Sequence, residues 1–138
     1  MSDVGYSALN SAVLTTSLSA IGQIAMPVKD LARAVEFYRD RLGLPFLFQV
    51  PPALAFFQCG NIRLMLDVPT EAEFQHPGSP LYFVVRDIDE AHRDLQHRGV
   101  AFRDAPHLIA RMPDHELWMA FFHDGEGNTH ALMHEKRG

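Results

Sequence analysis

The stretch from His107 to Trp118 gathers the residue types that most often bind ligands or transfer protons. A histidine beside carboxylates can act as a general base when a carboxylate fixes the orientation of its ring. We therefore predict His115 as a catalytic base, oriented by Asp114 or Glu116. The ligand contacts expected around it are His107, Arg111 and Trp118. The alternative is a charged hairpin with Trp118 in the core, because tryptophan is often simply buried.

A second group of candidate residues lies on an expected strand at 62–68. There Arg63, Met65 and Asp67 alternate with apolar residues, so these three side chains share one face. A fixed positive charge on that face favours an anionic or carbonyl group of a ligand. We predict Arg63 as a catalytic residue that steadies an enolate or carboxylate, with Met65 and Asp67 as ligand contacts. The alternative is a surface arginine, or one paired with Asp67.

Two further side chains are expected to contact the same ligand. Gln23 lies on the first expected strand, at 21–28, and is predicted to steady the ligand together with Arg63. Tyr82 shares a strand face with Pro80 and Val84, and it is the best candidate for a hydroxyl that lines the pocket.

The eight histidines do not by themselves predict a metal site, because metal binding needs convergent geometry. Cys59 is the only cysteine, which excludes an internal disulfide and a cysteine-based zinc site. His130 and His134 are expected on the strand face opposite Ala131 and Met133, turned toward a helix or solvent.

The elements that must position these residues occur twice along the chain. The first set has strands at 21–28, 45–50, 54–59 and 62–68, with a helix capped by Asp30 and ended by Gly43. The second set has strands at 81–86, 100–103, 107–112, 117–123 and 129–133, with a helix at 87–98 whose start, Asp87 and Glu90, is a capping box. Val28, Asp30 and Leu31 return as Val85, Asp87 and Ile88, which indicates a duplicated module.

The predicted fold class is α+β. Two βαβββ modules in one chain form a curled mixed sheet with a concave cup, and the helices lie on the outer face. We divide the chain into an N-terminal appendage at 1–20, a first module at 21–68, a linker at 69–80 and a second module at 81–134.

Composition excludes several classes of protein. A chain of 138 residues with 47% hydrophobic and 21% charged residues is typical of one globular domain. The net charge of -5 and the dispersed basic residues argue against nucleic acid as a partner. No membrane span and no secretory signal are predicted, so we expect a cytoplasmic protein.

The two βαβββ modules, the V-x-D starts of both helices, the helix end FYRDRLGL and the sequence DGEGNTHALM together resemble the vicinal oxygen chelate superfamily. This superfamily includes glyoxalase I, bleomycin-resistance proteins and extradiol dioxygenases. The resemblance covers residues 21–134, and it implies the fold described above.

In the metal-dependent members of that superfamily, two positions on each module bind a divalent ion. The resemblance carries these positions onto Gln23, a residue near Arg63, Pro80 and Ala131. A register shifted by two residues would put Met65 or Asp67 in the second place. Proline and alanine carry no donor atom, and a guanidinium repels a cation, so we expect no metal cofactor.

Three functions follow as hypotheses. The first is a protein that has lost most metal ligands and binds a small, partly aromatic or anionic molecule in the cup, with metal-free acid–base chemistry by His115. The second is a protein that sequesters a drug or metabolite, as the bleomycin-resistance relatives do. The third is a metal-dependent lyase, isomerase or dioxygenase. The resemblance also implies a homodimer.

Overall fold

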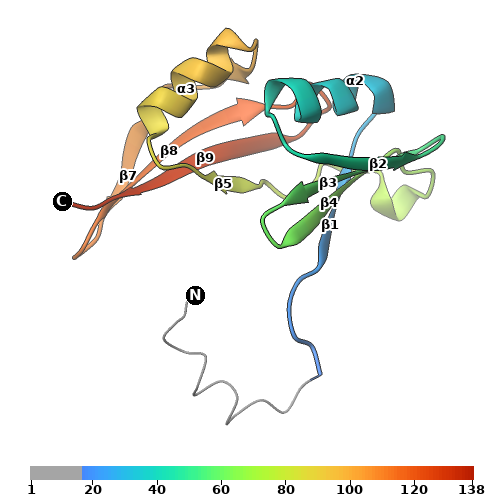
Figure 1. Cartoon of the computed structure of the whole chain (residues 1–138), viewed down its shortest axis with the longest axis horizontal. Coiled ribbons are helices and arrows are strands. Elements are labelled where there is room, and N and C mark those ends of the chain that lie inside the picture. The colour runs from blue at the N-terminus through green and yellow to red at the C-terminus, as the bar shows by residue number, and fades with distance from the viewer. Residues whose placement is uncertain (1–16) are drawn as a thin grey trace.

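The computed structural model describes residues 17–138, which form two βαβββ modules placed side by side (Figure 1). The predicted α+β class is confirmed, with two mixed sheets and few helices. Most of the expected N-terminal appendage, including its weak helical spacing from Tyr6 to Leu14, lies outside the described residues.

The first module is a four-stranded sheet covered by one helix. Its elements are β1 (Gln23–Pro27), α2 (Leu31–Glu36), the π-helical segment η1 (Phe37–Arg41), β2 (Phe46–Val50), β3 (Leu54–Cys59) and β4 (Ile62–Asp67). The strand order is β1-β4-β3-β2, and β1 runs parallel to β4 while the other neighbours are antiparallel.

The second module repeats this plan after a linker that contains the short helix η2 (Ala72–Phe74). Its elements are β5 (Tyr82–Val84), α3 (Ile88–His97), β6 (Ala101–Phe102), β7 (His107–Arg111), β8 (Glu116–His123) and β9 (Thr129–Lys136). The order is β5-β9-β8, and the two short strands β6 and β7 both pair with β8. β5 is parallel to β9, as β1 is to β4.

Both helices begin at the predicted caps. The carboxylate of Asp30 accepts from the backbone N of Arg33 at 3.1 Å, and Asp87 accepts from Glu90 N at 3.1 Å. Behind the helices, Gly43 (φ 77°) and Gly99 (φ 88°) take the left-handed conformation that favours glycine.

The first helix differs from the prediction of one continuous α-helix up to Gly43. From Phe37 on, the backbone hydrogen bonds span five residues instead of four, which is the π-helical pattern. Leu42 N, for example, donates to Phe37 O at 2.9 Å. One extra residue is accommodated in this way, because Gly43 lies one position later relative to Val28 than Gly99 does relative to Val85.

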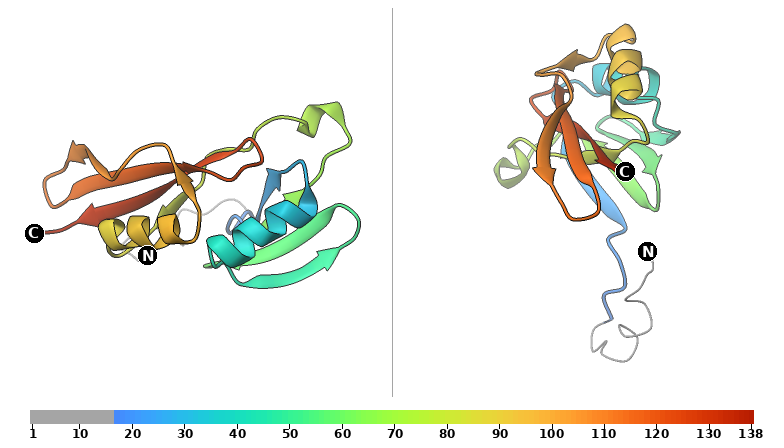
Figure 2. Two further views of the ribbon diagram at one scale, coloured as in Figure 1. Left: turned by 90° about the horizontal axis from the view of Figure 1, so that it is seen from above. Right: turned by 90° about the vertical axis from the view of Figure 1, so that its left-hand side faces the viewer.

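The two helices cover the same side of the molecule, and a single apolar cluster beneath them joins both modules (Figure 2). Its largest fully buried apolar members include Phe57 and Leu64 from the first module and Phe122 and Ile88 from the second. Within the described residues, neither long helix lies on the opposite sheet faces, which are turned away from α2 and α3 (Figure 1). We call this side the open face. Within residues 17–138, no helix is long and apolar enough to cross a membrane.

Candidate functional site

The open face of the first module carries the predicted residues of β1 and β4. The parallel register places Gln23 beside Arg63 and Pro27 beside Asp67, with Met65 between the two pairs on the same face. Strand alternation turns the intervening Leu64 and Leu66 into the core, where both are buried.

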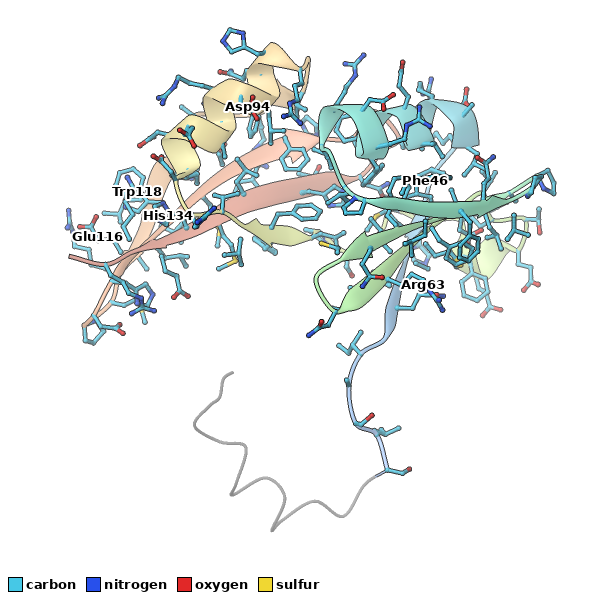
Figure 3. All side chains as sticks on the ribbon, in the orientation of Figure 1. Phe46, Arg63, Asp94, Glu116, Trp118 and His134 are labelled. Carbon is cyan, nitrogen blue, oxygen red and sulfur yellow. The ribbon has the colours of Figure 1, made fainter. Side chains whose placement is uncertain are left out.

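Arg63 is held by two contacts on this face (Figure 3). Its Nε donates to Gln23 Oε1 at 2.8 Å, and its guanidinium lies 5.5 Å from the centre of the Phe56 ring. Phe48 stacks on Phe56 with ring centres 4.7 Å apart. Within residues 17–138, Arg63 makes no ion pair and its terminal nitrogens have no hydrogen-bond partner. The expected alternative, a pair with Asp67, is therefore not what the structure shows.

The open face of the second module is aromatic as well. Tyr82 is 46% exposed and meets Phe121 edge to face, with ring centres 6.1 Å apart. His107 lies opposite Met119 on the same face, and its Nδ1 is 3.0 Å from the carbonyl oxygen of Ala105. Sequence reasoning missed Arg103, whose guanidinium lies 4.6 Å from the Phe121 ring centre. The available signal was its position directly after the inward-facing Phe102.

His115 lies in the hairpin between β7 and β8. Its Nδ1 is 2.7 Å from Asp114 Oδ1, so Asp114 is the carboxylate that orients the ring. Hydrogen bonds from His115 and Arg137 hold the pKa of Asp114 below its usual range. The other ring nitrogen, Nε2, faces Glu135 Oε2 at 3.9 Å, a contact that sequence reasoning did not include.

Trp118 and Arg111 lie on the helix side of the second sheet and not on the open face. The Trp118 indole packs against the core, its Nε1 donates to Glu116 Oε1 at 3.1 Å, and the Lys136 amine lies 4.1 Å from its ring centre. Arg111 forms an ion pair with Glu116. The structure therefore shows the charged hairpin with tryptophan against the core, and Trp118 lies at the same end of the module as His134 and Glu116 (Figure 3).

A buried polar network joins the two modules, and sequence reasoning missed it. The sequence at 124–128 predicts an ordinary hairpin turn. In the structure, however, Asp124, Glu126 and Asn128 are each at most 3% exposed. Asp124 accepts from Tyr38 OH at 2.6 Å and from Asn128 Nδ2 at 2.7 Å. It also accepts from the backbone N of Glu126 and Asn128.

Glu126 completes the start of the first helix from the other module. Its Oε1 accepts from the backbone N of Lys29 and Asp30 at 2.8 and 2.9 Å, and its Oε2 accepts from Arg33 Nε at 2.5 Å. The Glu126 side chain is fully buried, so these three donors replace its hydration.

His130 is the innermost member of this network. Its Nδ1 accepts from Leu81 N at 3.0 Å, so the ring carries its proton on Nε2, which lies 2.9 Å from Tyr38 OH. Burial lowers the pKa of His130 to about 4. Burial and the charge of Asp124 raise the pKa of Tyr38. The ring points toward the helix, as expected. It therefore stabilises the junction between the modules and does not reach the open face.

The positions equivalent to metal ligands can be aligned through the two sheets. Val28 N donates to Asp67 O, and Val85 N donates to Met133 O, so Met65 is the counterpart of Ala131. This corrects the second position from near Arg63 to Met65, the two-residue shift left open by the sequence. Of Gln23, Met65, Pro80 and Ala131, only Gln23 carries an oxygen donor, and that oxygen already accepts from Arg63.

This donor set does not fit a divalent ion. Among residues 17–138, no group of three or more His, Cys, Asp or Glu side chains is arranged to hold a metal.

The comparisons with known proteins indicate one and the same family. The family model described as Glyoxalase/Bleomycin resistance protein/Dioxygenase superfamily matches residues 20–132. The uncharacterized protein YraH of Bacillus subtilis (strain 168) is 30% identical over 122 residues, and the match covers 77% of this chain and 91% of that protein.

Solved structures agree with this family. A glyoxalase/bleomycin resistance protein/dioxygenase superfamily member from Sphaerobacter thermophilus has a TM-score of 0.73 at 25% identity, over 87% of this chain and 100% of that one. Lactoylglutathione lyase from Agrobacterium tumefaciens has a TM-score of 0.65 at 26% identity, over 85% and 94%. TnmS3, an antibiotic binding protein from Streptomyces sp. CB03234, has a TM-score of 0.69 at 26% identity, over 88% and 99%.

Proposed function

Since the chain belongs to the Glyoxalase/Bleomycin resistance protein/Dioxygenase superfamily, we propose that its open face binds a small molecule with an anionic group and an aromatic or apolar body. The observation that carries this proposal is the state of Arg63. It is oriented by Gln23 and by the Phe56 ring, and its terminal nitrogens make no hydrogen bond within residues 17–138.

An oriented guanidinium with free donors matches a carboxylate better than a lysine would, because its planar fork binds both carboxylate oxygens. The stacked rings of Phe48 and Phe56 lie next to it and give an apolar surface for the rest of the ligand. Phe48 is 46% exposed, so part of this aromatic surface is free for contact.

We propose that this binding does not use a divalent ion, because Arg63 occupies the place next to Gln23 with its own positive charge. Elemental analysis of protein purified without a histidine tag tests this. A stoichiometric divalent metal would contradict the proposal and favour the alternative of metal-dependent lyase, isomerase or dioxygenase chemistry.

The comparison of bound anions and neutral analogues tests the ligand class. Isothermal titration should show that 2-naphthoate binds the wild-type chain more tightly than 2-naphthamide, which has the same shape without the charge. In Arg63→Gln this preference should disappear. Equal affinities of the wild type for the two compounds would contradict the proposal.

We further propose a homodimer in which the first module of one chain and the second module of the other share one binding site. Within residues 17–138, β1 pairs with β4 alone and β5 with β9 alone, so each sheet has a strand edge available. Val84 on β5 is 78% exposed, and an uncovered apolar edge of this kind favours pairing with a second strand.

The dimer is tested by light scattering after gel filtration. Val84→Glu should convert the dimer to a monomer, because it puts a charge on β5 at the edge proposed to meet the second chain. Val50→Glu is the matched control, since Val50 is 46% exposed but lies on the outer strand β2. A monomeric wild-type chain would contradict the dimer.

A second candidate function is acid–base catalysis by His115, favoured by its hydrogen bond to Asp114. The solved structures named above include both a lyase and an antibiotic binding protein at 26% identity, so resemblance does not separate catalysis from binding. Products from the bound compound, lost in both His115→Ala and Arg63→Ala, would support catalysis. Saturable binding with an unchanged ligand would support a binding protein.

A further inference from the structure

The open face carries a second arginine, Arg103, in surroundings that resemble those of Arg63. Each guanidinium lies over a phenylalanine ring, at 5.5 Å for Arg63 on Phe56 and at 4.6 Å for Arg103 on Phe121. The backbone fixes Arg103 in place, because its N donates to Phe121 O at 2.7 Å.

The groups around Arg103 leave its guanidinium available. Asp104 forms a long ion pair with it, because Asp104 Oδ2 lies 3.8 Å from Arg103 Nε, but this distance is beyond that of a hydrogen bond. The other oxygen of Asp104 accepts from Phe121 N at 3.0 Å, and Oδ2 also lies 3.9 Å from His107 Nδ1. No hydrogen bond to the Arg103 guanidinium occurs within the part of the chain that the structure describes.

Phe121 lies between Arg103 and the residues of the second module's open face that were described above. Phe121 pairs with Ala131, which in turn pairs with Tyr82 on β5. Arg103 therefore lies near Ala131, one of the positions equivalent to metal ligands in the second module, as Arg63 lies beside Gln23, one of those in the first.

We propose that Arg103 forms a second anion-binding subsite and that the ligand carries two anionic groups on an aromatic or flat apolar body. One group is bound by Arg63 of one chain and the other by Arg103 of the partner chain. This inference rests on the proposed function and on its shared site. It narrows the ligand class from an aromatic anion to an aromatic dianion, such as a dicarboxylate.

The test compares two probes on the full-length dimer, 2-naphthoate and naphthalene-2,6-dicarboxylate. The wild type should bind the dicarboxylate about tenfold or more tightly than the monocarboxylate, because a charge-assisted hydrogen bond is added. Arg103→Gln should remove this advantage and leave the affinity for 2-naphthoate within about twofold. Arg103→Lys should keep part of it, since the charge remains.

The matched control is Arg93→Gln, which removes an exposed arginine from α3 on the helix side. It should change neither affinity. Thermal unfolding of Arg103→Gln should stay close to the wild type, because Arg103 is itself exposed.

A mixed dimer locates the two arginines relative to one another. When an Arg63→Gln chain is paired with an Arg103→Gln chain, one shared site keeps both arginines and the other keeps neither. Titration with the dicarboxylate should then give tight binding at half of the sites. A complete loss of tight binding would show that both arginines act from one chain, and would overturn the shared arrangement.

Failure of the inference is distinguishable from failure of the proposed function. If both probes bind equally and only Arg63→Gln weakens them, the second subsite is overturned and the aromatic anion site stands. If Arg63→Gln weakens neither probe, the proposed function fails as well.

Discussion

Two polar regions of this molecule differ in the burial and hydrogen bonding of their charged groups. At the junction between the modules, the carboxylates of Asp124 and Glu126 are buried and accept from four and three donors of the chain. On the open face, Arg63 is exposed and uses one of its donors on Gln23. The acceptor sites of the first region are filled at Asp124 and nearly filled at Glu126, whereas the terminal donors of Arg63 in the second region stay free.

The difference separates residues that stabilise the fold from residues that are available to a ligand. A buried carboxylate is tolerated only when its hydrogen bonds are complete, so the junction should be sensitive to any deletion. An exposed guanidinium contributes little to stability, so the open face should tolerate substitution and respond in binding.

The largest expected effect is at the junction. Asp124→Ala leaves four donors without their acceptor, and we expect it to lower the free energy of unfolding by about 3–5 kcal/mol, since each buried unsatisfied donor costs about 1–3 kcal/mol. Urea denaturation followed by circular dichroism measures this. Asp40→Ala is the control, because Asp40 is exposed and, among residues 17–138, its carboxylate bonds only to the neighbouring Arg39. Equal losses in the two variants would remove the contrast between the regions.

The next effect is a dependence on pH that belongs to the junction alone. Burial lowers the pKa of His130 from 6.5 to about 4, so the folded chain keeps the ring neutral where the unfolded chain protonates it. The stability present above pH 6.5 is therefore lost as the pH falls toward 4, by roughly 3 kcal/mol at 1.36 kcal/mol for each unit. Below that range the contribution stays constant.

Comparison of the wild type with His130→Gln isolates this contribution from the titration of other groups. The difference in their unfolding free energies should shrink between pH 7 and pH 4. Gln96→Ala on the exposed side of α3 provides a control that removes no titratable group, so its difference from the wild type should not change with pH. A difference for His130→Gln that is independent of pH would contradict the expectation.

The third prediction tests whether a residue of the open face affects binding without affecting stability. Arg63→Gln should lower the affinity for 2-naphthoate about tenfold, while changing the unfolding free energy by less than about 0.5 kcal/mol. Calorimetric titration and urea denaturation of the same sample measure both quantities. A large loss of stability without a loss of affinity would place Arg63 with the structural residues.

The smallest effect concerns a charged contact on the helix side. Lys136→Met keeps the apolar stem but removes the amine, which lies over the Trp118 ring and 3.6 Å from Asp89 Oδ2, and it should lower the free energy of unfolding by about 0.5–1 kcal/mol. Trp118 is the only tryptophan, so its fluorescence reports the change directly. Lys29→Met, which removes an exposed lysine of the first module, should leave the fluorescence unchanged.

Sequence periodicity was sufficient for most of the fold. The strand Leu54–Cys59 was predicted to the residue, and the second helix within one residue at each end. The π segment was not predicted, because the apolar spacing of Leu31, Val35, Tyr38 and Leu42 fits either helical pattern over so short a length. β9 continues past the predicted end at Met133 to Lys136, because it pairs with the whole of β8.

The candidate site was predictable only in part. Alternation alone placed Arg63, Met65 and Asp67 on one face, but the partner of Arg63 depends on the register between β1 and β4, which are distant in sequence. The burial of Asp124 and Glu126 could not be inferred, because acidic residues beside glycines are usually exposed in turns. Arg103 escaped notice because its ring partner, Phe121, comes from another strand.

The capping of the first helix by Glu126 has a consequence for biosynthesis. The amides of Lys29 and Asp30 find their acceptor only after Glu126, more than ninety residues later, has left the ribosome. The first module of the nascent chain therefore lacks part of its native hydrogen bonding until most of the second module has been synthesised, so the first module cannot complete its fold before the second.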